Sequence, residues 1–262
     1  MKRKRIGFWE ALSIGIGGMI GGGIFAVLGL SVQISKSAAP LSFLIAGIVA
    51  LTTAYSYAKL SIRYPSKGGT TEFLVKAYGT GVLSGFLNVL LLTSYIVMIS
   101  LYAYTFGCYG VNLVSQNFPL LKHILISLVI VVFTLINALG ALISGRVEDL
   151  LVAFKVAILL LVIFASVTLI NFNKFAPSNW PEPLSIISGG MIIFLAYEGF
   201  ELIANASGDV EDVSIIPKAF YLAVIIVIII YVMIAVVTIG ILPYSTIISA
   251  RDYVLAIAAN LR

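Results

Sequence analysis

Three ionisable side chains lie well inside long apolar stretches of this sequence: Lys155, Glu198 and Glu201. A charged residue at the centre of a membrane helix costs about 2.5–3.5 kcal/mol on insertion scales, so such residues usually face a helix bundle or a cavity and mark the path of an ion or a proton. We therefore expect these side chains to bind a proton or an ion. A structural ion pair between the lysine and a glutamate is the alternative explanation.

The composition indicates that these residues lie in a membrane. The chain has 262 residues, of which 61% are hydrophobic and 10% charged, and its mean hydropathy is +1.12. Soluble domains carry about 25% charged residues, so we expect an all-α polytopic membrane protein. The net charge of +5 comes from basic residues in short loops, which set the orientation of membrane helices and do not indicate a nucleic-acid partner.

The same composition argues against an enzyme. One cysteine and one histidine are too few for a disulfide framework or for a zinc site built from those residues. The sequence contains no paired aspartates, no other set of metal ligands and no Gly-x-Ser-x-Gly motif. We therefore expect no catalytic residue, no metal and no cofactor.

Seven segments are long and apolar enough to cross the hydrocarbon of a bilayer, which takes about 20 residues. They cover residues 8–34, 41–62, 82–113, 124–143, 150–170, 186–206 and 219–242. Residues 243–262 read as an amphipathic helix on the outer surface. Basic residues are more frequent near the N-terminus, around residues 59–76 and at Arg146 and Lys218 than on the opposite side. Because basic loops stay in the cytoplasm, we expect a cell-membrane protein with its N-terminus inside and the end of this chain outside.

The first segment contains an unusual run of glycines. Residues 15–25 read GIGGMIGGGIF, and six of these eleven residues are glycine. Each glycine in a helix interior costs roughly 0.5–1 kcal/mol relative to alanine. Such a run indicates unwound backbone that lines a cavity or is buried in protein, as at the binding sites of many transporters. Close packing of helices through small residues is the alternative.

The sixth segment repeats this irregularity. Gly199 lies between Glu198 and Glu201 near the middle of the segment. Paired interruptions in corresponding helices are the best sequence indication of an inverted-repeat transporter with a binding site at the membrane midplane. The two segments therefore predict one shared site.

Three motifs resemble the signatures of one transporter family. GGMIGGGIF at residues 17–25 resembles a glycine-rich break in helix 1, and RYPSKGGTTEFLVKAYG at 63–79 resembles the loop after helix 2. FLAYEGFELIANASGDVEDVSIIPKAF at 194–220 resembles helix 6 and the polar loop leading to helix 7. With these motifs the chain resembles, over essentially its whole length, the amino acid permeases of the amino acid–polyamine–organocation superfamily.

This resemblance implies a leucine-transporter-type fold, which is built from two five-helix repeats of inverted topology. Residues 1–262 then form a single membrane domain, with the first repeat at 8–170 and the first two helices of the second repeat at 186–242. Helices 8 to 10 of that fold are absent from this sequence. We therefore expect the N-terminal portion of a permease, which is either incomplete or completed by another chain.

The resemblance also implies roles for individual residues. Backbone N–H groups of the first break are expected to bind the substrate carboxylate, and carbonyls of the second break are expected to bind its amine. Glu198 is expected to contact the amine or a basic side chain. Lys155, nine residues after Arg146, is expected to bind the coupling proton, with Glu201 as a proton-sensing residue. The backbone positions are Met19, Ile20, Gly21, Gly22 and Gly23 in the first break, and Phe194, Leu195, Ala196 and Tyr197 in the second.

The expected function is secondary active transport of an amino acid, coupled to a proton and working by alternating access. The expected partners are an amino acid, a proton, membrane lipid, and either a second copy or a completing chain. Two other functions stay open at this point. The chain could be a non-transporting permease fragment or binding subunit, or a retinal-type seven-helix protein in which Lys155 forms a Schiff base. The substrate's identity also stays open, because an apolar site favours a neutral amino acid whereas Glu198 favours a cationic one.

Overall fold

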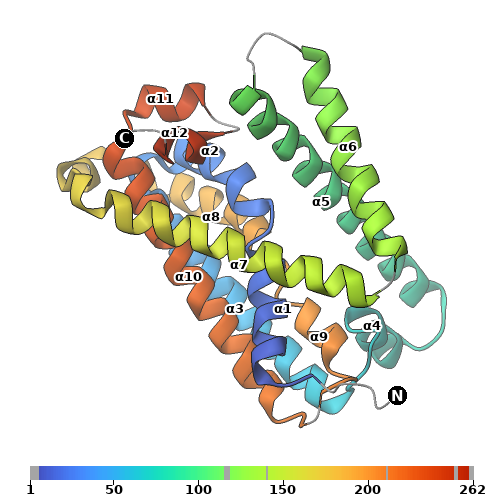
Figure 1. Ribbon diagram of the computed structural model, residues 1–262. Helices are drawn as coiled ribbons and strands as arrows, with labels where there is room; N and C mark the ends of the chain where they lie inside the picture. Colours follow the sequence, from blue (N-terminus) through green and yellow to red (C-terminus); the bar gives the residue numbers. More distant parts are fainter. Residues whose placement is uncertain (1–5, 115–118, 140, 211, 251–252, 260–262) are drawn as a thin grey trace.

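The computed structural model describes residues 6–114, 119–139, 141–210, 212–250 and 253–259 (Figure 1). These residues form helices and no strand, apart from a single parallel bridge between Ile6 and Val210. The long helices are α1 (Phe8–Met19), α2 (Gly23–Ser35), α3 (Ala39–Arg63), α5 (Val82–Val114), α6 (Pro119–Ala138), α7 (Ala141–Ser166), α8 (Pro183–Tyr197) and α10 (Ile215–Ile241). The shorter ones are α4 (Thr70–Tyr78), α9 (Leu202–Ala206), α11 (Tyr244–Ser249), α12 (Val254–Ala259) and the 3₁₀ turns η1 (Lys36–Ala38), η2 (Val167–Leu169), η3 (Phe172–Phe175) and η4 (Pro177–Asn179).

The prediction of an all-α polytopic membrane protein is confirmed. Six stretches of the described chain are long and apolar enough to span a membrane. The count differs from the seven predicted segments because one stretch, Gly23–Arg63, runs through 41 residues and contains both α2 and α3. The chain turns between these helices at η1, where Lys36 has a φ of 48°.

Two helices begin before the apolar segments predicted for them. The candidate spans Leu120–Ala138 and Asp149–Leu169 lie within a few residues of the predicted segments 124–143 and 150–170, whereas the helices themselves begin at Pro119 (α6) and Ala141 (α7). Hydropathy locates the apolar middle of a helix, whereas the hydrogen-bonded helix continues through flanking polar residues. One such residue, Lys122, lies in α6 with its ammonium 3.7 Å from the centre of the Tyr104 ring on α5.

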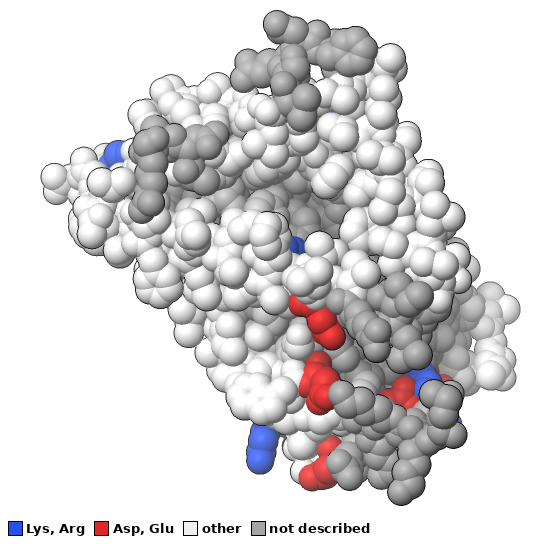
Figure 2. All heavy atoms as spheres, in the orientation of Figure 1, with Lys and Arg blue, Asp and Glu red and all other residues white. Residues whose placement is uncertain are grey.

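The helices form one packed group with a hairpin beside it. Figure 1 shows α7 running across the group that contains α1, α3, α8 and α10, with α5 and α6 side by side at the edge. The described chain begins at Ile6, which is bridged to Val210 shortly after α9, and α11 and α12 lie at the opposite end of the molecule. Figure 2 shows that the described side chains over most of the visible face are uncharged, and that acidic side chains gather toward the end where α4 and α9 lie. This distribution fits a surface that contacts lipid.

Small residues allow α3 and α10 to pack closely. Ala46, Ala50, Ala54 and Ala58 recur every fourth residue along α3 and are all buried, so they lie on one face of the helix. A side chain added at Gly47 on the same helix would collide with Ile228 of α10. Small residues at helix contacts let backbones approach in a membrane, where packing and not the hydrophobic effect drives association. This packing supports α8 and α1, which carry the candidate site.

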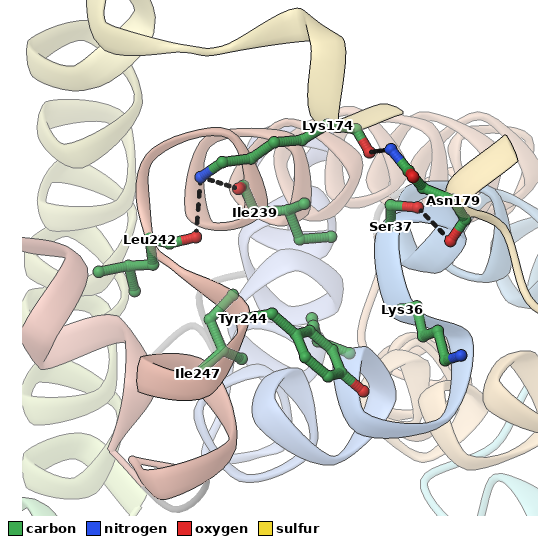
Figure 3. Close-up of a pocket in the computed structure, with 9 residues that line it drawn as sticks. Lys36, Ser37, Lys174, Asn179, Ile239, Leu242, Tyr244 and Ile247 are labelled. Carbon is green, nitrogen blue, oxygen red and sulfur yellow. Dashed lines mark hydrogen bonds between the residues drawn. The ribbon is translucent and has the colours of Figure 1, made fainter. Parts of the chain in front are cut away.

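The end of α10 is held by a lysine from the loop after α7. Figure 3 shows the Lys174 side chain reaching the last turn of α10, where its Nζ donates to the carbonyl oxygens of Ile239 at 3.2 Å and Leu242 at 2.9 Å. The last four carbonyls of a helix have no partner within the helix, and a cation there also interacts favourably with the helix dipole. Partial burial lowers the pKa of Lys174. The same corner holds α11 and α12, whose buried residues include Ile247 and Leu255.

We predict that Lys174→Met lowers the stability of the chain. Hydrogen bonds to a charged group each contribute about 1.5–3 kcal/mol, and both bonds to α10 are lost. The measurement is the midpoint of thermal unfolding in detergent, which should fall by several degrees. Lys36→Met is the control, because Lys36 lines the same pocket without contacting the end of α10. Equal midpoints for the two variants would show that the cap contributes nothing.

Candidate functional site

The first predicted helix break is present. Helix α1 ends at Met19 and α2 begins at Gly23, with Ile20 to Gly22 outside either helix. Hydrogen bonds within the chain already use two of the predicted amide groups, because Ile20 N–H donates to Ile16 O at 2.8 Å and Gly21 N–H donates to Met19 O at 2.7 Å. The first amides of α2 have no carbonyl partner within that helix. The donors that can face a ligand are therefore those from Gly22 and Gly23 onward.

The second predicted break is also present. Helix α8 ends at Tyr197 and α9 begins at Leu202. Gly199 between them has a φ of 123°, a conformation that favours glycine. Its N–H donates to Oε2 of Glu201 at 2.6 Å. The Glu201 carboxylate therefore holds the break in shape, while the partly exposed Glu198 lies on the break itself.

Two of the four carbonyls predicted to bind the substrate amine are already used inside the protein. The carbonyl oxygen of Leu195 accepts from Glu198 N–H at 3.4 Å, and that of Ala196 accepts from the Tyr231 hydroxyl at 3.2 Å. The predicted positions that remain are Phe194 and Tyr197. The C-terminal end of a helix carries partial negative charge at such carbonyls, which suits a cation.

The two breaks lie against each other, backbone to backbone. A Cβ added at Gly18 would lie 2.6 Å from the carbonyl oxygen of Gly199, and one added at Gly199 would collide with the backbone of Gly18. On the other side of the break, a Cβ at Gly23 would lie 2.8 Å from Cα of Ala196. The two backbones approach so closely that only glycine fits at these positions. This contact is consistent with the prediction that the two irregular segments share one site.

One residue that joins the two breaks was missed by the sequence analysis. The hydroxyl of Tyr231 on α10 lies 2.7 Å from Met19 O and 3.2 Å from Ala196 O, so it shares its proton between a carbonyl of each break. Tyr231 is fully buried, and its ring packs against Tyr197 and Phe43 at centroid distances of 5.1 and 6.1 Å. The only sequence signal was a hydroxyl in an otherwise aliphatic stretch of the seventh segment.

Lys155 on α7 reaches the first break from the other side. Its Nζ donates to the carbonyl oxygen of Gly17, in the last turn of α1, at 3.3 Å. One turn earlier on α7, Val152 packs so closely on Gly17 that a side chain there would collide with it. Lys155 and the break residues Gly21 and Gly22 line a cavity of about 650 Å³. In that cavity, a Cβ added at Gly22 would lie 2.5 Å from the Tyr102 ring of α5.

The segment that follows α9 is tied both to the loop after α3 and to the residue that precedes α1. Ser66 N–H donates to Oγ of Ser207 at 3.1 Å, and the Ser207 hydroxyl lies 3.1 Å from Ser66 O. Nζ of Lys67 lies 2.6 Å from Oδ2 of Asp209. The N–H of Ile6, just before α1, donates to the carbonyl of Asp209 at 3.0 Å. We call these contacts the loop clasp.

No group of three or more histidine, cysteine, aspartate or glutamate side chains that could hold a metal lies in the described part of the chain. The ionisable side chains at or beside the two breaks are Lys155, Glu198 and Glu201.

Comparison with known proteins shows which family and which proteins this chain is similar to. A family model described as amino acid permease matches residues 6–261. The chain is 38% identical over 237 residues to the inner membrane transport protein YbaT of Escherichia coli, a match that covers 89% of this chain and 55% of that protein. It is 27% identical over 265 residues to the branched-chain amino acid permease BcaP of Lactococcus lactis, covering 90% of this chain and 56% of that protein.

A third relative has a different named substrate. The chain is 26% identical over 267 residues to the cationic amino acid transporter 9 of Arabidopsis thaliana, a match that covers 92% of this chain and 46% of that protein. The chain thus spans about half the length of these relatives. The matches confirm the resemblance inferred from the three motifs, support a transporter and not an enzyme, and give no support to the retinal-type alternative.

Proposed function

This chain belongs to the amino acid permease family, and we propose that it forms the N-terminal part of a proton-coupled amino acid symporter that works by alternating access. The observation that carries the proposal is the contact between the two helix breaks, at Gly18 and Gly199. A pair of broken helices places an N-terminal helix end and a C-terminal helix end at one point in the membrane. An amino acid carries one charge of each sign and matches both ends.

The proposed site binds the backbone of the substrate. Amides at the start of α2, from Gly22 and Gly23, bind the carboxylate, because a helix N-terminus attracts an anion. The carbonyls of Phe194 and Tyr197, at the end of α8, bind the ammonium. Met19, Ile20, Gly21, Leu195 and Ala196 shape the breaks through the bonds they already make.

The proposed proton site is Lys155. Its bond to Gly17 O couples its protonation to the position of α1, because the neutral amine loses much of the strength of a charge-assisted hydrogen bond. Glu201 is the second candidate proton site, since protonation would weaken its bond to the Gly199 amide. Glu198 lies beside this point and is available to the substrate amine.

The proposed orientation places the N-terminus and the loop clasp in the cytoplasm and α11 and α12 outside, in accord with the distribution of basic residues. We further propose that residues 8–170 form the first repeat and 186–242 the start of the second. In this proposal the remaining helices of the transporter correspond to the half of the relatives' length that this chain does not span, or are supplied by a second copy or another chain.

The loop clasp is proposed to keep the cytoplasmic side closed. We predict that the single variants Lys67→Glu and Asp209→Lys open it, and that the double reversal closes it again. An exposed ion pair contributes about 0.2–1 kcal/mol, so opening should increase by up to about fivefold. The measurement is the rate at which a maleimide labels Ala204→Cys, a buried position on α9, in a Cys108→Ala background. Equal labelling rates in all variants would contradict a gating role.

The test of the proposed function is uptake of a labelled amino-acid panel into proteoliposomes, with and without an inward proton gradient. Gradient-driven accumulation supports the symporter. Saturable binding of an amino acid without uptake supports the alternative of a binding subunit or a non-transporting fragment. Neither binding nor uptake by folded protein would overturn both.

A further inference from the structure

A cavity of about 370 Å³ lies at the end of the molecule that carries α11 (Figure 3). Its walls come from the end of α2, the turn η1, the loop that follows α7, the last turn of α10, and α11. The apolar stretch of α10 ends beside it at Ile241, so the cavity lies where a membrane helix leaves the hydrocarbon. Trp180 in the loop after α7 is exposed, and tryptophan is enriched at the membrane–water interface. The cavity is therefore at the level of lipid headgroups.

The inner part of the cavity lining is aliphatic. Val32, Leu242 and Ile247 line the cavity and are otherwise buried among the packed helices. Contact with hydrocarbon is favourable for such a surface, because the contact removes apolar area from water. This lining suits an acyl chain and offers nothing to a small hydrated anion.

Two lysines, Lys36 and Lys174, line the same cavity. Within the described part of the chain, neither ammonium has a carboxylate as its ion-pair partner. Two of the three N–H donors of the Lys174 ammonium bind backbone carbonyls of α10, which are neutral acceptors and leave its positive charge uncompensated. The cavity therefore combines aliphatic surface with two cations, which complements a molecule that has an anionic end and an apolar end.

Hydrogen bonds join the two segments that carry these lysines. The Ser37 hydroxyl donates to Asn179 O at 3.0 Å, and Nδ2 of Asn179 donates to Lys174 O at 3.3 Å. Figure 3 shows this connection between the turn that carries Lys36 and the loop that carries Lys174, with the two lysines on different sides of the cavity. The fold therefore sets where the two lysines stand relative to each other.

Lys36 itself occupies a position that favours glycine. Its φ and ψ are 48° and −132°, and it is the only non-glycine residue with a positive φ among the residues that the structure describes. A residue with a Cβ is strained in this conformation, and strain of this kind is concentrated at functional sites. A lysine at such a position indicates a role for its side chain.

We propose that this corner binds an anionic phospholipid from the membrane leaflet on the side of α11. The phosphate binds between Lys36 and Lys174, and an acyl chain lies against Val32 and Ile247. One lysine near a membrane surface strengthens the binding of anionic lipid by about fivefold, so two lysines favour an anionic over a zwitterionic headgroup by at least about tenfold. A free phosphate would use the lysines but not the aliphatic lining. The residues that line this cavity are not those of the two breaks, so the inference does not depend on the proposed function.

The test substitution is Lys36→Gly, which removes one cation and relieves the strained backbone. In neutral detergent without lipid, its thermal unfolding midpoint should equal or exceed that of the unmodified chain, whereas phosphatidylglycerol should bind it about fivefold more weakly. Lys36→Met keeps the backbone strain and should show the same loss of affinity. Lys59→Met is the matched control, because it removes one exposed lysine near the opposite end of α3, and it should bind the lipid as the unmodified chain does.

The measurement is the unfolding midpoint of the purified chain during titration with phosphatidylglycerol, phosphatidylcholine or inorganic phosphate, with native mass spectrometry to detect retained lipid. We expect phosphatidylglycerol to stabilise the protein at concentrations at least about tenfold below those of phosphatidylcholine, and inorganic phosphate to have no effect. Equal stabilisation by the two lipids, or the same loss in Lys59→Met as in the Lys36 variants, would overturn the site. Stabilisation by inorganic phosphate as strong as that by phosphatidylglycerol would show a site for a soluble anion and overturn the lipid.

Discussion

Lys155→Met is expected to abolish the effect of an inward proton gradient on amino acid uptake. The substitution keeps the length of the side chain but removes the ammonium that donates to Gly17 O at 3.3 Å. A hydrogen bond from a charged group contributes about 1.5–3 kcal/mol, which corresponds to roughly 10- to 100-fold in the equilibrium that it biases. Gradient-driven accumulation should therefore fall by at least about tenfold, to the level seen without a gradient.

The controls separate coupling from folding. Lys155→Arg keeps a permanent cation at the same place, so the variant should bind substrate and still show no response to the gradient. Lys59→Met removes an exposed lysine that lies 5.6 Å from the centre of the Tyr55 ring, and it should behave as the unmodified chain. Gradient-dependent uptake that survives in Lys155→Met would move the proton site to Glu201.

The helix breaks could be predicted because glycine destabilises a helix interior, so a run of glycines in an apolar segment indicates that the backbone has another role there. A membrane helix gains nothing from residues such as Gly21 to Gly23 unless the backbone leaves the helix or approaches another backbone closely, and both conditions hold here. Gly199, between Glu198 and Glu201, gave the same indication of a helix break in the sixth segment. The recurrence of the interruption in the first and sixth segments then indicated that the two segments are paired, and the resemblance of the motifs agreed with this pairing.

The bonds that shape the site could not be predicted. The Tyr231 hydroxyl can bond to both breaks because α10 passes close to both Met19 and Ala196. The position of α10 depends in turn on its packing against α3. Likewise, the amides of Ile20 and Gly21 were expected to bind substrate but donate within the chain, because Ile20 N–H completes the last turn of α1 and Gly21 N–H bonds back to Met19 O. The sequence identifies which backbone leaves a helix, whereas tertiary contacts decide which of its groups remain available.

Gly199→Ala is expected to give the largest loss of stability in this chain. Gly199 has a φ of 123°, and an added Cβ would collide with the backbone of Gly18. A non-glycine residue in a rarely populated backbone region costs about 1–3 kcal/mol, and overpacking typically costs another 1–3 kcal/mol. Neither backbone can move freely, because the Tyr231 hydroxyl binds Met19 O and Ala196 O on either side of the contact.

The measurement is the thermal unfolding midpoint in detergent, together with the yield of monodisperse protein. Gly85→Ala is the matched control, since Gly85 lies in helix α5 with nothing within 4 Å of an added Cβ, and alanine there should be neutral or stabilising by about 0.5–1 kcal/mol. If Gly199→Ala unfolds at the control's midpoint, the two breaks do not meet backbone to backbone, and a site shared between them loses its physical basis. A loss of stability confined to Gly199→Ala would instead show that the backbone contact between the two breaks holds the fold together.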